Sequence, residues 1–192
     1  MKKLFYFFIV GMLISEIGHS QDLTITDNSK LFYKFNEFDK AVTYEFAIKS
    51  ITPTIAYEWS NSNKGENGLG IVTQEAMEGA INLTFYYIED GFITLYDRTP
   101  SFLISRKIYE ELKETKKSRI RIQDNENTNT LELIGIEDYD LIINKEEKKV
   151  KVLHATLSGD SGYEIWILDN PGFPIVVKLK TFKEYELKEV KQ

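Results

Sequence analysis

The sequence predicts a mainly β protein: a single curved antiparallel sheet of about ten short strands, in a half-barrel or sandwich, with one short helix near residues 105–116. Apolar and polar residues alternate through almost all of the chain after residue 20, which is typical of half-buried strands. Turn-forming residues recur about every 8 to 12 residues, a spacing typical of antiparallel sandwiches and barrels.

The alternation places the strands individually. We expect them over residues 41–48, 55–59, 81–87, 92–96, 118–122, 131–136, 139–144, 150–157, 162–168, 175–179 and 182–190. Gly91 is expected to close a tight hairpin between residues 81–87 and 92–96, because glycine readily adopts positive φ.

Helical periodicity is found only after Thr99-Pro100. Ser105 is the expected N-cap, and the expected apolar face is formed by Ile108, Tyr109 and Leu112. This helix is expected to end near Lys116, and a second, very short helical turn is expected over residues 74–79.

The first 20 residues have the pattern of a secretory signal peptide. Lys2 and Lys3 precede an 11-residue apolar run, residues 4–14, which is shorter than the roughly 20 residues that a membrane-spanning helix needs. Gly18 and Ser20 suit signal peptidase cleavage after residue 20. No cysteine follows the run, so we expect an exported periplasmic or secreted protein that is not a lipoprotein and has no permanent membrane span.

Residues 21–192 are expected to form a single β-rich domain. Without residues 1–20 the chain loses two lysines and one glutamate, which leaves 22 basic and 29 acidic residues and a net charge of −7. Nucleic acid is therefore excluded as an expected partner. The absence of cysteine means that packing, and not disulfide bonds, must stabilise the exported chain.

The sequence offers little support for catalysis or metal binding. The string GDSG at residues 159–162 is found around the nucleophile of serine proteases, but that chemistry needs a well-placed histidine, and His154 is the only one after residue 20. His154 continues the alternation of Val150 and Val152, so we expect a hydrogen-bonded core residue. We predict no catalytic residue, no metal site and no cofactor.

One carboxylate pair keeps an enzymatic alternative open. Glu45 and Glu58 are each flanked by aromatic residues, and glycoside hydrolysis uses two facing carboxylates. The alternation, however, places both on the face opposite the aromatic side chains, which is the expected solvent side.

Two segments carry a resemblance to known proteins. The ending YEIWILDNPGFPIVVKLKTFKEYELKEV at residues 163–190, with its DNP-x-FP turn, resembles the tail of uncharacterised exported bacterial β-rich proteins, and DRTPSFLISRKIYEEL at residues 97–112 is similar to a segment of the same group. The resemblance implies a β-clam sheet, similar to that of periplasmic lipoprotein carriers, without assigned catalytic residues.

The carrier resemblance also implies where a ligand would bind. The chain contains 23 tyrosine and phenylalanine residues, enough to line a groove. A concave aromatic face would accept a lipid or another apolar small molecule, and the candidate residues are Tyr57, Trp59, Phe85, Tyr87 and Phe92.

Three functions remain open at this point. We expect a non-enzymatic envelope protein that binds an apolar or amphipathic ligand or an envelope protein. The alternatives are a carboxylate-dependent hydrolase acting on envelope glycan, and an adhesion or assembly module that uses exposed sheet edges.

Overall fold

The computed structural model describes residues 23–37, 40–84, 91–122, 127–158, 160–181 and 184–192. Its described part contains two helices, α1 (Gln74–Gly79) and α2 (Arg106–Thr115). The strands are β1 (Lys30–Glu37), β2 (Lys40–Ser50), β3 (Ile55–Asn61), β4 (Glu66–Val72), β5 (Asn82–Thr84), β6 (Gly91–Leu95), β7 (Arg98–Pro100), β8 (Lys117–Ile122), β9 (Asn129–Ile143), β10 (Glu146–Leu157), β11 (Asp160–Leu168), β12 (Val176–Lys180) and β13 (Glu184–Lys191).

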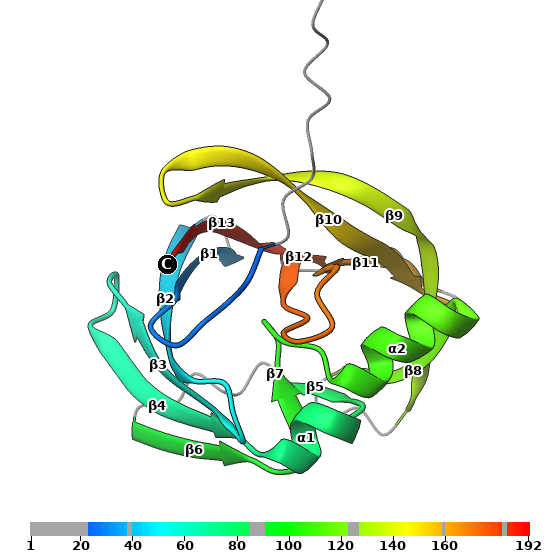
Figure 1. Ribbon diagram of the computed structural model, residues 1–192, viewed down its shortest axis with the longest axis horizontal. Coiled ribbons are helices and arrows are strands. Elements are labelled where there is room, and N and C mark those ends of the chain that lie inside the picture. The colour runs from blue at the N-terminus through cyan, green and yellow to red at the C-terminus, as the bar shows by residue number, and fades with distance from the viewer. Residues whose placement is uncertain (1–22, 38–39, 85–90, 123–126, 159, 182–183) are drawn as a thin grey trace, which may run out of the picture.

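These 13 strands form one curved sheet in the order β6-β4-β3-β2-β1-β13-β12-β11-β10-β9-β8-β5-β7 (Figure 1). Most neighbours are antiparallel, whereas β4–β6, β5–β7 and β5–β8 are parallel. The mainly β class and the curved sheet are confirmed. The sheet has more strands than the sequence predicted, and it is mixed.

The outermost strands of the sheet, β6 and β7, are joined by only two residues, Tyr96 and Asp97, so the chain links the two ends of the sheet and the strands surround a common interior (Figure 1). In addition, the end of β9 pairs in parallel with the end of β13 through Ile142–Glu189 and Ile143–Val190. Strands β9 to β13 therefore form a ring of their own.

The expected hairpin between residues 81–87 and 92–96 is wrong. Strand β5 pairs in parallel with β7 and β8, whereas β6 pairs in parallel with β4 at the other end of the sheet. Alternation of apolar residues predicts that a segment is a strand, but it does not select the partner strand. Residues 85–90, between β5 and β6, lie outside the described residues.

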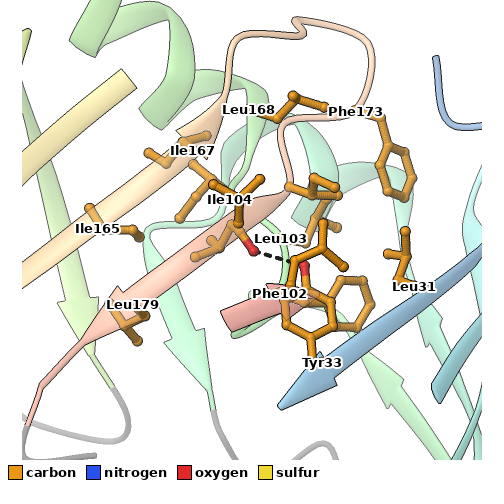
Figure 2. Close-up of a cluster of buried hydrophobic side chains, with 14 of the residues drawn as sticks. Leu31, Tyr33, Phe102, Leu103, Ile104, Ile165, Ile167, Leu168, Phe173 and Leu179 are labelled. Atoms are coloured by element: carbon orange, nitrogen blue, oxygen red, sulfur yellow. Dashed lines mark hydrogen bonds between the residues drawn. The ribbon is translucent and has the colours of Figure 1, made fainter. Parts of the chain in front are cut away.

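A short irregular segment, residues 101–105, runs through the interior and connects β7 to α2. Every residue of this segment is fully buried. Its backbone is hydrogen-bonded inside the protein, because Ile104 N donates to Pro174 O at 3.0 Å and Val176 N donates to Phe102 O at 2.9 Å. Figure 2 shows its side chains within the surrounding apolar cluster. The segment therefore fills the space that the curved sheet encloses.

Aromatic rings dominate the core around this segment. The ring of Phe102 lies 4.7 Å from that of Phe46, 5.1 Å from that of Tyr57 and 6.4 Å from that of Tyr33, measured between centroids. Edge-to-face pairs such as Tyr57–Phe102, with an interplanar angle of 88°, stabilise a core beyond the area that they bury. The many aromatic residues of the sequence thus pack against one another.

Both predicted helices are present. Ser105 caps α2, where its side chain accepts a hydrogen bond from Ile108 N, and Lys116 ends the helix in the left-handed conformation with φ 66°. The buried residues of α2 are Ile108, Tyr109 and Leu112, as predicted. Helix α1 begins after Thr73, whose side chain accepts from Ala76 N.

We expect Phe102→Ala to lower the free energy of unfolding by about 3–5 kcal/mol, because it opens a cavity among the core rings. Phe92→Ala is the matched control, since the Phe92 side chain is 62% exposed, and it should change stability by less than about 0.5 kcal/mol. Urea denaturation of both variants checks this. Equal stability losses would show that residues 101–105 do not support the core.

Candidate functional site

The structure separates the five candidate residues. Tyr57 and Trp59 are buried on the inner face of β3. Phe92 lies on β6 opposite Leu69 of β4, on the outer face, and is largely exposed. Phe85 and Tyr87 lie outside the described residues. The inner face of β3 is therefore the part of the predicted site that the structure can place.

The inner face of β3 is formed by every second residue of the strand. Ile55, Tyr57, Trp59 and Asn61 are all buried, whereas Glu58 between them is exposed. This alternation follows from the pleat of a strand whose one face meets the core. Sequence analysis included Tyr57 and Trp59 but missed Asn61, although Asn61 continues the same spacing of two.

Two glycines of β4 accommodate the large rings of β3. Tyr57 pairs with Gly70 and Trp59 pairs with Gly68 in the antiparallel register. A Cβ on Gly70 would overlap the ring carbon Cζ and the hydroxyl of Tyr57, and a Cβ on Gly68 would lie 2.9 Å from Trp59 Cε2. The rings therefore lie across the backbone of β4 in the space that side chains would otherwise take.

The rings reach toward the neighbouring strand β6. The same Cβ position on Gly68 lies 2.5 Å from Trp59 Nε1 and 2.8 Å from the carbonyl oxygen of Gly91, the first residue of β6. The indole N–H thus lies near β6, the strand at one end of the sheet.

Three hydrogen-bond donors on this face have no partner among the described residues. They are the Tyr57 hydroxyl, Trp59 Nε1 and Asn61 Nδ2. The other amide atom of Asn61, Oδ1, accepts from Asn63 N at 2.9 Å and shapes the β3–β4 turn. Burial raises the pKa of the Tyr57 hydroxyl above its ordinary value, so this group stays protonated and able to donate.

Two further buried polar atoms without partners have a local explanation. Asn82 Oδ1 and Arg121 Nε belong to residues that face each other in the register of β5 and β8. An acceptor and a donor on paired residues can meet after a small side-chain rotation. Tyr57 has no such acceptor opposite it, because its partner on β4 is Gly70, whereas Asn61 pairs with Glu66.

Other buried tyrosines of the core do have partners. Tyr33, on the neighbouring inner face of β1, donates to Val176 O at 2.7 Å (Figure 2). Tyr185 on β13 donates to Ser101 O. The unpaired hydroxyl of Tyr57 is therefore a particular feature of β3.

The carboxylate pair of the hydrolase hypothesis lies on the outer face, as the alternation predicts. Glu45 and Glu58 are diagonal neighbours on β2 and β3, and they line a shallow pocket of about 180 Å³. Glu45 forms an ion pair with Lys30 and Glu58 with Lys49, both at 2.7 Å. Ion pairs of this kind across neighbouring strands are common on exposed sheet surfaces.

His154 belongs to a polar network on β9 to β12. Its Nε2 lies 3.0 Å from Glu164 Oε2, and its ring stacks on Trp166 with 4.3 Å between centroids. Trp166 Nε1 donates to Glu137 at 2.7 Å, and Lys180 donates to Glu164 at 2.8 Å. The predicted hydrogen bond of His154 is confirmed. The predicted core position is wrong, because His154 is half-buried beside Glu164 and Trp166 and is not part of the apolar core.

The described residues contain no group of three or more His, Cys, Asp or Glu side chains arranged to hold a metal ion. Among the same residues, no helix is both long enough and apolar enough to cross a membrane.

Replacing single tyrosines tests the unequal hydrogen bonding. Tyr33→Phe should lower the free energy of unfolding by about 1–3 kcal/mol, because it leaves the buried Val176 carbonyl without a donor. Tyr57→Phe removes a hydroxyl without a partner and should leave the stability of the ligand-free protein unchanged or slightly higher. Chemical denaturation measures both, and equal destabilisation would contradict the unpaired state of Tyr57.

Replacing single glycines tests the fit of the rings. Gly70→Ala should destabilise the protein by about 1–3 kcal/mol, because the new methyl group overlaps the Tyr57 ring. Gly135→Ala in β9 is the matched control, since a Cβ there meets nothing within 4 Å. Thermal unfolding compares the two, and similar melting temperatures would show that the Tyr57 ring does not lie across β4.

No family model, curated protein or solved structure matches this chain.

Proposed function

We propose that this protein is a non-enzymatic binding protein that holds a small, neutral, amphipathic ligand along the inner face of β3. The observation that carries the proposal is the row of three donors, Tyr57, Trp59 and Asn61, without partners among the described residues. Buried donors are nearly always paired in native proteins, and an unpaired one costs about 1–3 kcal/mol. A ligand with three acceptor atoms would pair all three donors and remove this cost for each of them.

The donors define the polar part of the ligand. A hydroxyl, an indole N–H and an amide NH₂ all donate, so the ligand must present acceptor atoms, such as carbonyl, ester or ether oxygens. Successive inward residues of a strand are about 7 Å apart, so the acceptors would be spread along the molecule. This pattern favours an extended ligand over a compact one.

No buried cation is found among the described residues, which favours a neutral ligand. The buried polar residues of the described chain are Ser29, Asn61, Thr84, Thr99, Ser101, Ser105 and Ser118. None of them carries a positive charge, and a carboxylate or phosphate buried without a counter-ion would be strongly destabilised. An acyl ester or amide meets both requirements, whereas a free fatty acid does not.

The apolar part of the ligand would contact the rings. Phe46 and Phe102 lie 6.0 and 5.1 Å from the Tyr57 ring, and Tyr44 lies 6.3 Å from Trp59. These rings fill the interior, so the ligand must displace part of the packing. We place its entry beside β6, because the Trp59 indole reaches toward this end of the sheet.

The place of action is part of the proposal. The lysines and apolar run of residues 1–20, and the resemblance of residues 163–190 to exported β-rich proteins, support a place in the cell envelope. A binding protein needs no catalytic residue. In agreement with this, His154 is hydrogen-bonded to Glu164, and the carboxylates of Glu45 and Glu58 form ion pairs with lysines.

Native mass spectrometry of the exported protein, residues 21–192, tests the proposal directly. We expect a bound species of near-stoichiometric amount that is released by denaturation and contains ester or amide groups. An apo mass under all gentle conditions, together with no binding of added monoacylglycerol, would refute a ligand of this class.

Variants of β3 should weaken binding without unfolding the protein. Tyr57→Phe removes one donor and keeps the ring, whereas Trp59→Phe removes one donor together with part of the ring, and each should lower affinity for monoacylglycerol about three- to tenfold. Phe92→Leu on the outer face is the control and should leave affinity unchanged. Isothermal titration gives these values, and an equal loss in Phe92→Leu would place the ligand elsewhere.

A further inference from the structure

The middle of β9 has a free backbone edge among the described residues. On one side, β9 pairs with β10 over residues 131–143, with an irregularity that leaves Ile134 without a partner residue on β10. On its other side it pairs with β8 only through residues 129–132 and with β13 only through residues 142–143. Leu133 N donates to Lys116 O, so on this side residues 134–141 have no neighbouring strand among the described residues. In Figure 1, β9 and β10 arch from beside α2 to a tip beside β13.

The free edge carries exposed apolar side chains. Ile134 is 58% exposed and Ile136 is 46% exposed, and they flank Gly135 at an irregularity in the β9–β10 register. Natural proteins usually protect such an edge, because its unpaired backbone groups can pair with another chain. Exposed isoleucines beside a free edge are therefore the features of a strand-addition site.

The charge of β9 decides between possible occupants. Its described side chains include Glu132, Glu137, Asp138 and Asp140, and the strand contains no lysine or arginine. A second copy of β9 would bring these carboxylates together, which is unfavourable for directly opposed residues. A partner strand with lysine or arginine at alternate positions would instead complement them.

We propose that residues 134–141 of β9 bind an extended cationic segment of a partner protein, which adds to the sheet as a further strand. Backbone hydrogen bonds to the free edge would supply affinity, and contacts with Ile134 and Ile136 would fix the register. The carboxylates select the cationic partner and also prevent two copies from pairing through this edge.

The carboxylates of β9 can form ion pairs with a partner segment, although lysines of β10 already pair with some of them. Asp138 pairs with Lys151 at 2.7 Å, and Asp140 pairs with Lys149 at 3.0 Å. All four side chains are about half exposed, and exposed ion pairs contribute little stability and rearrange readily. A partner lysine can therefore share or replace these contacts.

Fluorescence anisotropy with short labelled peptides tests the proposal. A peptide of alternating lysine and valine should bind the purified protein about tenfold or more tightly than a peptide of alternating glutamate and valine. Amide hydrogen exchange should show new protection within residues 134–141 when the cationic peptide is present, because the free N–H groups become paired.

A matched pair of variants separates strand addition from general attraction to an acidic protein. Ile136→Lys should weaken the cationic peptide about tenfold, whereas Phe92→Lys makes the same charge change at another exposed apolar residue and should change binding less than twofold. Equal weakening by both variants, or protection of amides outside β9, would overturn the proposal. Concentration-dependent dimers with residues 134–141 protected in the absence of peptide would also overturn it, in favour of self-association.

Discussion

The fold depends on one constraint, which is that an irregular segment buried in the interior must find partners for its backbone. Residues 101–105 are removed from water, so their amide and carbonyl groups must be hydrogen-bonded within the protein. The loop before β12 and the start of that strand supply the partners, and Tyr185 of β13 donates to Ser101. These hydrogen bonds hold β12 and β13 against residues 101–105, and α2 follows the segment directly in the chain. The curved sheet therefore surrounds a filled interior.

The candidate site lies on the inner face of β3, where the hydrogen bonds to residues 101–105 and β12 do not extend. Tyr33 and Tyr57 have the same side chain and the same full burial, yet only Tyr33 has an acceptor, because β1 faces the backbone of β12. Tyr57 instead lies across Gly70, which offers no side chain at all. Glycines in β4 thus admit large rings and at the same time leave their donors unpaired, and this links the packing of the core to the proposed ligand.

On the outer surface, charged side chains and not apolar packing determine the interactions. Cross-strand ion pairs such as Lys30–Glu45 and Lys151–Asp138 lie on the exposed faces of the sheet. The long strand β9 is the exception, because it must reach β8 at one end and β13 at the other. A strand that spans this distance leaves its middle without a second neighbour, and its acidic side chains then decide what can pair with it.

Local patterns in the sequence were sufficient for the class of fold, for α2 with its Ser105 cap, and for the inward direction of Tyr57 and Trp59, because these features depend on neighbouring residues alone. Strand partners were not predictable in this way: β6 pairs with β4 and not with the segment before Gly91, since many alternating segments are compatible with one another. The missing acceptors of Tyr57, Trp59 and Asn61, and the free edge of β9, result from contacts between residues distant in sequence. Only the folded chain brings those residues together.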